Sequence, residues 1–280
     1  MSASWFEEED PFSPIRYRYR IEEVLHKRKS QYQEIQVLRS SFFGRILVLD
    51  GVVQLTERDE FIYHEMLTHV PMHLHGNPQR VLVVGGGDGG TVREVLRHPK
   101  AEAVLAELDP EVVEVAKAYF PRLAESLDSS RLNIFYGDAA DFVANATERF
   151  DVVLCDLTDP VGPARKLSET PFLESLKKIL TPGGVVATQS ESLYFHAQHV
   201  RQVQENLRSI FSSVGLYGVP VATYAGNWWT FSIASLGALT IDPCRAAVAG
   251  VRFYNGKVHS SSFISNEMLD SFVRGDHKDW

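Results

Sequence analysis

Hydrophobic and polar residues alternate in short stretches through the first part of the chain. Between residues 15 and 55, Ile35 and Val37 stand two apart, as do Ile46 and Val48, and glycine-containing turns separate the stretches. Alternation with a period of two places one set of side chains on each face of an extended strand. We therefore predict β-hairpins for this region.

From residue 61 onward the apolar spacing changes, first to a helical pattern over 61–71 and then to buried runs that alternate with helical segments. The expected order is strand 81–84, a helix to 98, strand 103–108, helix 110–120, strands 132–136 and 152–155, helix 169–180, strand 185–188 and helix 196–212. Such alternation is typical of an α/β fold with a largely parallel sheet. We predict a Rossmann-like, methyltransferase-type doubly wound sheet over residues 78–280. A small N-terminal β-hairpin domain with a connecting helix precedes it, over residues 1–77.

Composition narrows the possible partners. The 280 residues are 44% hydrophobic and carry a formal net charge of -8. The acidic balance argues against a nucleic-acid partner, because contacts to phosphate supply most non-specific affinity for nucleic acids. The N-terminus has no signal-peptide pattern, and no apolar run reaches the roughly 18 residues of a membrane span. The two cysteines lack metal or redox spacing. We expect a cytoplasmic protein with no membrane partner.

A glycine-rich loop follows the first strand of the second region. Residues 85–90 fit the G-x-G-x-x-G pattern between a strand and a helix, and Glu107 ends the next strand about 22 residues later. Asp88 within the loop sets this sequence apart. A carboxylate there would oppose a pyrophosphate by about 3 kcal/mol, for a separation of about 5 Å and an effective dielectric of about 20. The loop therefore favours a nucleoside that carries positive charge over NAD or a nucleoside triphosphate, although Asp88 could also serve only as a helix cap.

Further carboxylates follow other expected strands. The apolar run 152–155 ends in Asp156 and Asp159, and the next residues include two prolines. Because ligands of doubly wound sheets bind at the carboxyl ends of the strands, these acids should share one edge. The expected set at that edge is Asp88, Glu107, Asp138, Asp156 and Asp159. No lysine or arginine is near them in sequence, so we expect a bound cation there, and we favour an organic cation over a divalent metal.

Ordered motifs along nearly the whole chain resemble those of the polyamine aminopropyltransferases, the spermidine synthase family. They are Gln31-Tyr32-Gln33, Leu49-Asp50-Gly51, Gln54, Glu57-Arg58-Asp59-Glu60, Tyr63-His64-Glu65-Met66, the loop 85–90 with Arg93-Glu94-Val95, the run 156–163, and Phe253-Tyr254-Asn255 with His259. The resemblance implies transfer of the aminopropyl group of decarboxylated S-adenosylmethionine to an amine, with 5'-methylthioadenosine as co-product. It implies a homodimer or homotetramer and no metal or further cofactor.

The same resemblance implies roles for individual residues. Those expected at the donor are Gln33 and Glu107 for the nucleoside, Asp138 and Ala139 for the adenine, Pro163 in the wall of its pocket, and Asp88 for the aminopropyl ammonium. Those expected around the polyamine are Tyr63, His64, Asp88, Asp156, Asp159, Tyr224 and Trp229. Asp156 is the expected catalytic proton acceptor.

The residue chemistry agrees with these roles. An alkylamine with a pKa of about 10.4 must lose a proton before it attacks, which costs about 4.6 kcal/mol at pH 7 and which a positioned carboxylate can offset. Intact S-adenosylmethionine would place its own carboxylate against Asp88, so the decarboxylated donor is favoured by about 3 kcal/mol.

The acceptor is less constrained than the donor. Leu157 follows Asp156 where the family's common spermidine synthases tend to have a small residue, and the segment 223–229 lacks the Pro-Ser-Gly stretch often found after Tyr224. Putrescine is the favoured acceptor, and agmatine, cadaverine and spermidine remain open. Functions of other classes that fit less well are an amine N-methyltransferase, a binding protein without catalysis, and an NAD oxidoreductase.

Overall fold

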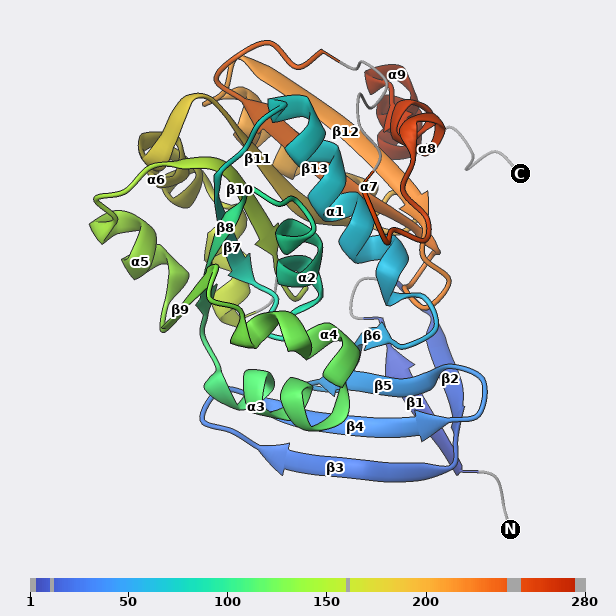
Figure 1. Ribbon diagram of the computed structural model, residues 1–280. Coiled ribbons are helices and arrows are strands. Elements are labelled where there is room, and N and C mark those ends of the chain that lie inside the picture. The colour runs from blue at the N-terminus through green and yellow to red at the C-terminus, as the bar shows by residue number, and fades with distance from the viewer. Residues whose placement is uncertain (1–3, 11–12, 160–161, 241–247, 275–280) are drawn as a thin grey trace.

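The N-terminal part of the chain forms two small antiparallel sheets (Figure 1). The protein is described by a computed structural model that covers residues 4–10, 13–159, 162–240 and 248–274. Strands β1 (Ser4–Glu9) and β2 (Arg16–Ile21) form a hairpin. The second sheet follows chain order, with β3 (Glu23–Lys29), β4 (Glu34–Ser40), β5 (Gly44–Leu49) and β6 (Val52–Thr56). The predicted hairpins are thereby confirmed.

An eight-stranded sheet in the order β14-β12-β13-β11-β10-β7-β8-β9 forms the centre of the rest of the chain. Strands β9, β8, β7, β10 and β11 are parallel, and β13, β12 and β14 are antiparallel to their neighbours. The strands are β7 (Arg80–Gly85), β8 (Glu102–Glu107), β9 (Leu132–Tyr136), β10 (Phe150–Asp156), β11 (Leu180–Ser192), β12 (Ser213–Pro220), β13 (Trp228–Ser235) and β14 (Phe263–Ile264). This topology confirms the predicted methyltransferase-type doubly wound sheet.

Helices cover both faces of this sheet (Figure 1). They are α1 (Glu60–His75), α2 (Gly90–Leu96), α3 (Pro110–Tyr119), α4 (Pro121–Ala124), α5 (Ala139–Asn145), α6 (Thr170–Ile179), α7 (Ala197–Arg208), α8 (Gly256–Ser261) and α9 (Asn266–Arg274), with 3-10 turns η1 (Glu125–Asp128) and η2 (Gly162–Ser168). Within β7, Val81 and Val83 pack toward α1 and α2, whereas Leu82 and Val84 pack toward α5, α6 and α7. Burial on both faces explains why this strand is a continuous apolar run.

The N-terminal sheets contact the larger unit at two places. Apolar residues of β4 and β5 form one cluster with residues of α3 and α4. The β1–β2 hairpin contacts the loop between β12 and β13, where Tyr19 Oη donates to the Thr223 carbonyl at 2.8 Å and Tyr17 Oη accepts from Gly226 N at 3.0 Å. The hairpin is therefore fixed beside the carboxyl edge of the large sheet. None of the helices within the described ranges is both long and apolar enough to cross a bilayer.

Glu65 of α1 holds the C-terminal segment against the sheet. Its carboxylate is 1% exposed and accepts the backbone N–H groups of Arg252, Phe253 and Tyr254 at 2.7, 2.8 and 2.7 Å. The three donors are shared between both carboxylate oxygens, whereas an amide would present one accepting oxygen and a donating NH2 group in place of the other. The motifs around Glu65 and Tyr254, which are almost 190 residues apart in sequence, therefore form one structural unit.

We expect Glu65→Gln to lower the free energy of unfolding by about 2–3 kcal/mol, because the amide NH2 group would face backbone donors in a buried site. Urea denaturation monitored by fluorescence measures this loss. Glu114→Gln on the exposed side of α3 is the matched control and should change stability by less than about 0.5 kcal/mol. Equal stabilities of the two variants would contradict the anchoring role.

Candidate active site

A cavity of about 530 Å³ opens at the carboxyl edge of the large sheet, which is within the size range of small-molecule sites. The β1–β2 hairpin, the N-terminal sheet and the loops after β7, β8 and β10 all contribute to its walls. It is lined by every expected site residue whose side chain the structure describes: Gln33, Tyr63, His64, Asp88, Glu107, Asp138, Ala139, Asp156, Asp159, Tyr224 and Trp229. The side chain of Pro163 lies outside the described residues. The structure therefore brings the expected residues together, while their roles stay predictions.

The glycine-rich loop packs directly on Asp156 at the end of β10. Gly85 and Gly86 have φ values of 74° and 76°, in the left-handed region that favours glycine. A Cβ atom at Gly85 would lie 2.3 Å from the Asp156 carbonyl oxygen, and one at Gly86 would lie 2.6 Å from Asp156 Oδ2. These glycines are required because the loop backbone and the Asp156 side chain occupy adjoining space.

Two hydroxyl groups orient the Asp156 carboxylate. Tyr63 Oη donates to Oδ1 at 2.8 Å, and Thr91 Oγ1 donates to Oδ2 at 2.6 Å. Burial and the charge of Asp156 raise the pKa of Tyr63 well above its usual value, so the phenol remains a donor. Each carboxylate oxygen retains acceptor capacity for a further proton donor in the cavity. Thr91 was not predicted as a site residue, because nothing in the sequence sets it apart from the other residues of α2.

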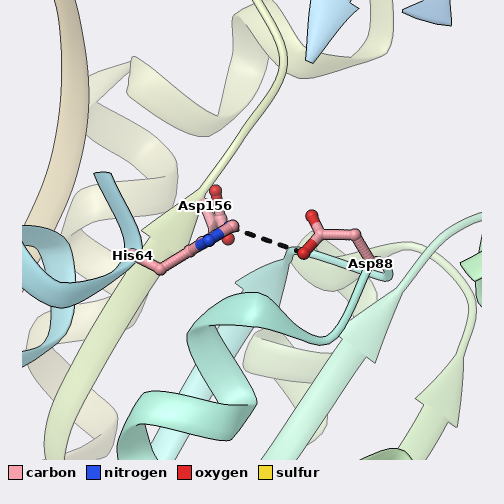
Figure 2. Close-up of side chains that lie close together, drawn as sticks. All are labelled: His64, Asp88 and Asp156. Atoms are coloured by element: carbon pink, nitrogen blue, oxygen red, sulfur yellow. Dashed lines mark ion pairs between the residues drawn. The ribbon is translucent and has the colours of Figure 1, made fainter. Parts of the chain in front are cut away.

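His64 lies between two acids, Asp88 and Glu60. Figure 2 shows its ring, which comes from α1, beside Asp156 and in an ion pair with Asp88. Nε2 is 3.4 Å from Asp88 Oδ1, and Nδ1 is 2.7 Å from Glu60 Oε2. Although burial alone lowers it, the carboxylates of Asp88 and Glu60 raise the pKa of His64 to about 9. The imidazole is therefore positively charged at neutral pH.

The ligand atoms of His64, Asp88 and Asp156 lie within 4.8 Å of one another, a spacing that could hold a metal ion. A metal would have to displace the proton of His64, because metals bind the neutral imidazole. Asp88 and Asp156 already have the protonated ring of His64 beside them. This charge arrangement fits an organic ammonium ion better than a metal, and the expected absence of a metal stays a prediction.

Glu107 and Gln33 lie at the end of the cavity expected to bind the nucleoside. Glu107 accepts the backbone N–H groups of Gly87 at 3.0 Å and Asp109 at 2.8 Å. Burial raises the pKa of Glu107 to about 7, and these two hydrogen bonds oppose the increase. Gln33 Nε2 donates to Asp109 Oδ2 at 3.0 Å. Asp109 thus connects Gln33 of the N-terminal region to the end of β8.

Asp138 has a cationic partner that is distant in sequence. Its Oδ1 accepts the N–H of Ala140 at 2.8 Å and caps α5, whereas its Oδ2 forms an ion pair with Lys166 of η2. Burial raises the pKa of Asp138, but Lys166 and the backbone amides outweigh this and lower it. The sequence did not indicate this partner, because the fold brings together residues 28 positions apart.

The opposite end of the cavity contains acids that sequence analysis missed. Asp159 is joined there by Glu8 and Asp10 of the hairpin region and by Glu191 of β11. His196 lies between two of these acids, with Nε2 3.1 Å from Asp10 Oδ2 and Nδ1 3.4 Å from Glu191 Oε2. Burial, reinforced by neighbouring acids, raises the pKa of Glu8 to about 7 and that of Asp159 to about 8. This far end therefore has an excess of carboxylates over cations.

The backbone of Glu191 supports a functional role for the far end. Its φ is 69°, which is unusual for a residue other than glycine, and its side chain is 2% exposed. Strained residues of this kind concentrate at functional sites. Gln189 supports the conformation, because its Oε1 accepts Glu191 N at 3.0 Å. No sequence signal could have identified Glu191, because the residues before it have only the pattern of a buried strand.

Aromatic rings close the side of the cavity between Asp156 and the far end. Tyr224 contacts Trp229 with ring centroids 4.6 Å apart, and it contacts Tyr63 edge to face at 5.6 Å. Rings of this kind attract cations through their negative faces. An alkylammonium chain could lie along this wall with acids at both ends.

Because several site groups keep protons that the unfolded chain releases, we expect stability without ligand to fall between pH 7 and 9. The pKa of His64 is raised, so its contribution is complete below pH 6.5 and is lost as pH rises through 9. The pKa of Asp159 is raised from 3.8 to about 8, so its contribution falls from pH 3.8 up to pH 8, whereas that of Glu107 falls from pH 4.5 and is already lost at about pH 7. Urea denaturation at several pH values measures the slope. Asp159→Asn should make it shallower, and a stability that stays flat or rises over this interval would contradict the expectation.

Comparisons with known proteins agree with this site. Residues 60–242 match the spermine/spermidine synthase domain, and residues 4–57 match the spermidine synthase tetramerisation domain. The chain is 43% identical over 274 residues to polyamine aminopropyltransferase 1 of Aquifex aeolicus (strain VF5), covering 98% of each chain. It is 41% identical to a spermidine synthase of Dictyostelium discoideum, covering 93% of this chain and 94% of that protein.

Solved structures give the same result. A crystal structure of spermidine synthase in complex with the transition state analogue AdoDATO superposes with a TM-score of 0.90 at 30% identity, covering 97% of this chain and 95% of that one. Spermidine synthase from Thermotoga maritima gives a TM-score of 0.87 at 29% identity, covering 97% and 94%. The protein therefore belongs to the spermine/spermidine synthase family of polyamine aminopropyltransferases.

Proposed function

We propose that the protein transfers the aminopropyl group of decarboxylated S-adenosylmethionine to putrescine, giving spermidine and 5'-methylthioadenosine. The observation that carries this proposal is the position of Asp156, in the middle of the cavity, with both oxygens oriented by Tyr63 and Thr91. A nucleoside end lies on one side of it and an acidic far end on the other. A carboxylate in this place can receive a proton from an amine that attacks the donor.

The proposed step is a direct displacement. The neutral acceptor nitrogen attacks the aminopropyl carbon next to sulfur, the carbon–sulfur bond breaks, and sulfur keeps the electron pair as a neutral thioether. Asp156 receives the proton that the acceptor ammonium must lose. Both substrates remain in one cavity throughout, so holding them in line supplies much of the rate. No covalent enzyme intermediate and no further cofactor are needed in this scheme.

Asp88 is the proposed contact of the donor's aminopropyl ammonium. Burial and the neighbouring Asp156 raise the pKa of Asp88, whereas His64 and the N–H of Gly90 lower it. An incoming ammonium would favour the ionised form in the same way as His64 does. The α-carboxylate of intact S-adenosylmethionine would instead be repelled, which disfavours the N-methyltransferase alternative.

The far end of the cavity supports an acceptor with a second ammonium group. Asp10 and Glu191 share the charge of His196, and the raised pKa values of Glu8 and Asp159 mean that these two acids ionise readily only when a cation arrives. One distal ammonium, as in putrescine, suits this charge. The number of acids also favours a second candidate acceptor with more positive charge, such as spermidine, while agmatine and cadaverine are further alternatives.

We also propose that the protein works in the cytoplasm as a homotetramer. The match of residues 4–57 to a tetramerisation domain supports the assembly. Sedimentation or light scattering of the purified protein gives the subunit number directly.

Incubation with decarboxylated S-adenosylmethionine and separate amines tests the reaction. We expect putrescine to give the highest kcat/KM and equal amounts of spermidine and methylthioadenosine, measured by mass spectrometry. If spermidine, agmatine or cadaverine gave a higher kcat/KM than putrescine, that amine would be the preferred acceptor instead. A methylated amine formed from intact S-adenosylmethionine, or no turnover with any amine, would reject aminopropyl transfer.

Asp156→Asn should reduce kcat by about 10²- to 10⁴-fold, because the amide cannot receive a proton from the acceptor. Circular dichroism and the binding of methylthioadenosine should remain close to those of the wild type. Asp128→Asn, at an exposed position outside the cavity, makes the same chemical change and should leave kcat within about twofold. Full activity of Asp156→Asn would exclude the proton-acceptor role.

A further inference from the structure

Glu60 contacts the active site through His64. It begins α1, four residues before His64, and its carboxylate accepts the Nδ1–H of that ring at 2.7 Å. Its side chain is 5% exposed and does not line the cavity. A residue in this position acts on the substrates by setting the orientation and the charge of the imidazole.

Arg93 of α2 fixes Glu60 from the other side. Its Nη1 and Nη2 donate to the two carboxylate oxygens of Glu60 at 3.1 and 2.9 Å, and its Nε donates to Glu94 at 2.7 Å. Although burial alone raises it, the contacts with His64 and Arg93 lower the pKa of Glu60 to about 2. Paired donation of this kind fixes the plane of a carboxylate. Glu60 is therefore a rigid, ionised acceptor for His64.

Gly90 packs against the side of the His64 ring formed by Nδ1, Cε1 and Nε2. A Cβ atom at Gly90 would lie 2.3 Å from His64 Cε1, so the ring occupies the space that any larger residue would need. With Glu60 at Nδ1 and Gly90 against the edge, Nε2 faces Asp88. The ring is 3% exposed and has little freedom to turn.

The contacts favour a proton on each nitrogen of His64. A carboxylate only accepts hydrogen bonds when ionised, and Nδ1 faces Glu60 while Nε2 faces Asp88. The groups that face the ring are Glu60 and Tyr63 of α1, Asp88 of the glycine-rich loop, and Asp156 at the end of β10, with Arg93 of α2 behind Glu60. The three carboxylates near the ring outnumber the one arginine, so their negative charge favours the protonated imidazolium form of His64.

We propose that Glu60 is a positioning residue that keeps His64 positively charged and turned toward Asp88 and Asp156, so that the empty site contains a cation of its own. This internal cation places positive charge beside two close carboxylates before the substrates bind. Without it, repulsion between Asp88 and Asp156 would favour a protonated Asp88, which cannot hold the donor's ammonium as strongly. The kinetic consequence rests on the proposed aminopropyl transfer, whereas the charge of His64 does not.

The charge is tested by NMR titration of the histidines, with the His64 signal assigned by its loss in His64→Gln. In the wild type we expect His64 to remain protonated through pH 8. Glu60→Gln should lower its titration midpoint by at least about one unit, a tenfold change in proton affinity. A wild-type midpoint near 6.5, or one that Glu60→Gln leaves unchanged, would overturn the proposal. The wild-type measurement decides the matter even if Glu60→Gln does not fold.

The kinetic test compares kcat/KM for the donor from pH 6 to 9. Glu60→Gln should lose activity increasingly as pH rises, by about threefold more at pH 8.5 than at pH 6 for a one-unit shift, because His64 regains its proton only at low pH. When His64 is already replaced by glutamine, adding Glu60→Gln should change kcat/KM by the same factor at every pH. Glu94→Gln, which removes the other acid bonded to Arg93, should leave the His64 midpoint unchanged.

A loss in Glu60→Gln that is the same at every pH would show a structural role only and would overturn the proposal. If the protein transfers no aminopropyl group to any amine, the pH dependence of methylthioadenosine binding replaces kcat/KM. In that case the NMR result still judges the Glu60–His64 pair separately from the proposed reaction.

Discussion

Mutual repulsion of carboxylates in a partly dehydrated cavity is the constraint on which the rest of this structure depends. The edge of the sheet collects Asp88, Glu107 and Asp156 near one another, and the far end adds further acids. Such a concentration of negative charge is unfavourable unless protons or cations offset it. The protein uses both, with the rings of His64 and His196 beside the acids and with raised pKa values at Glu8, Glu107 and Asp159. The proposed substrates would supply further positive charge.

The sheet and the acids that follow its strands could be predicted because both depend on local sequence. Buried runs such as Val81–Val84 have few alternatives to a central strand, and parallel strands place their carboxyl ends together. Asp88, Glu107 and Asp156 were therefore expected at one edge before any coordinates were known. Gln33 and Trp229, by contrast, were assigned only through family resemblance.

The far end could not be predicted, because it depends on contacts between distant segments. Asp10 reaches His196 across 186 residues, and nothing around either residue indicates the other. Lys166 was also missed, since its pairing with Asp138 depends on how η2 folds over the cavity. Thr91 and Glu60 lie in regular helices, where their polar groups could equally have faced solvent. Sequence reasoning identified the chemistry at the sheet edge and missed Lys166, His196 and Glu60, which adjust its charge.

The β1–β2 hairpin has a consequence for how such enzymes can diversify. It supplies Glu8 to the end of the cavity proposed for the acceptor and contacts the loop 223–227 through Tyr17 and Tyr19, whereas Asp156, the proposed proton acceptor, belongs to the larger unit. Substitutions in the hairpin can therefore alter the length or charge of the amine that fits without disturbing bond-making atoms. Replacing the β1–β2 hairpin alone could therefore change which amine is accepted, in evolution or in protein design.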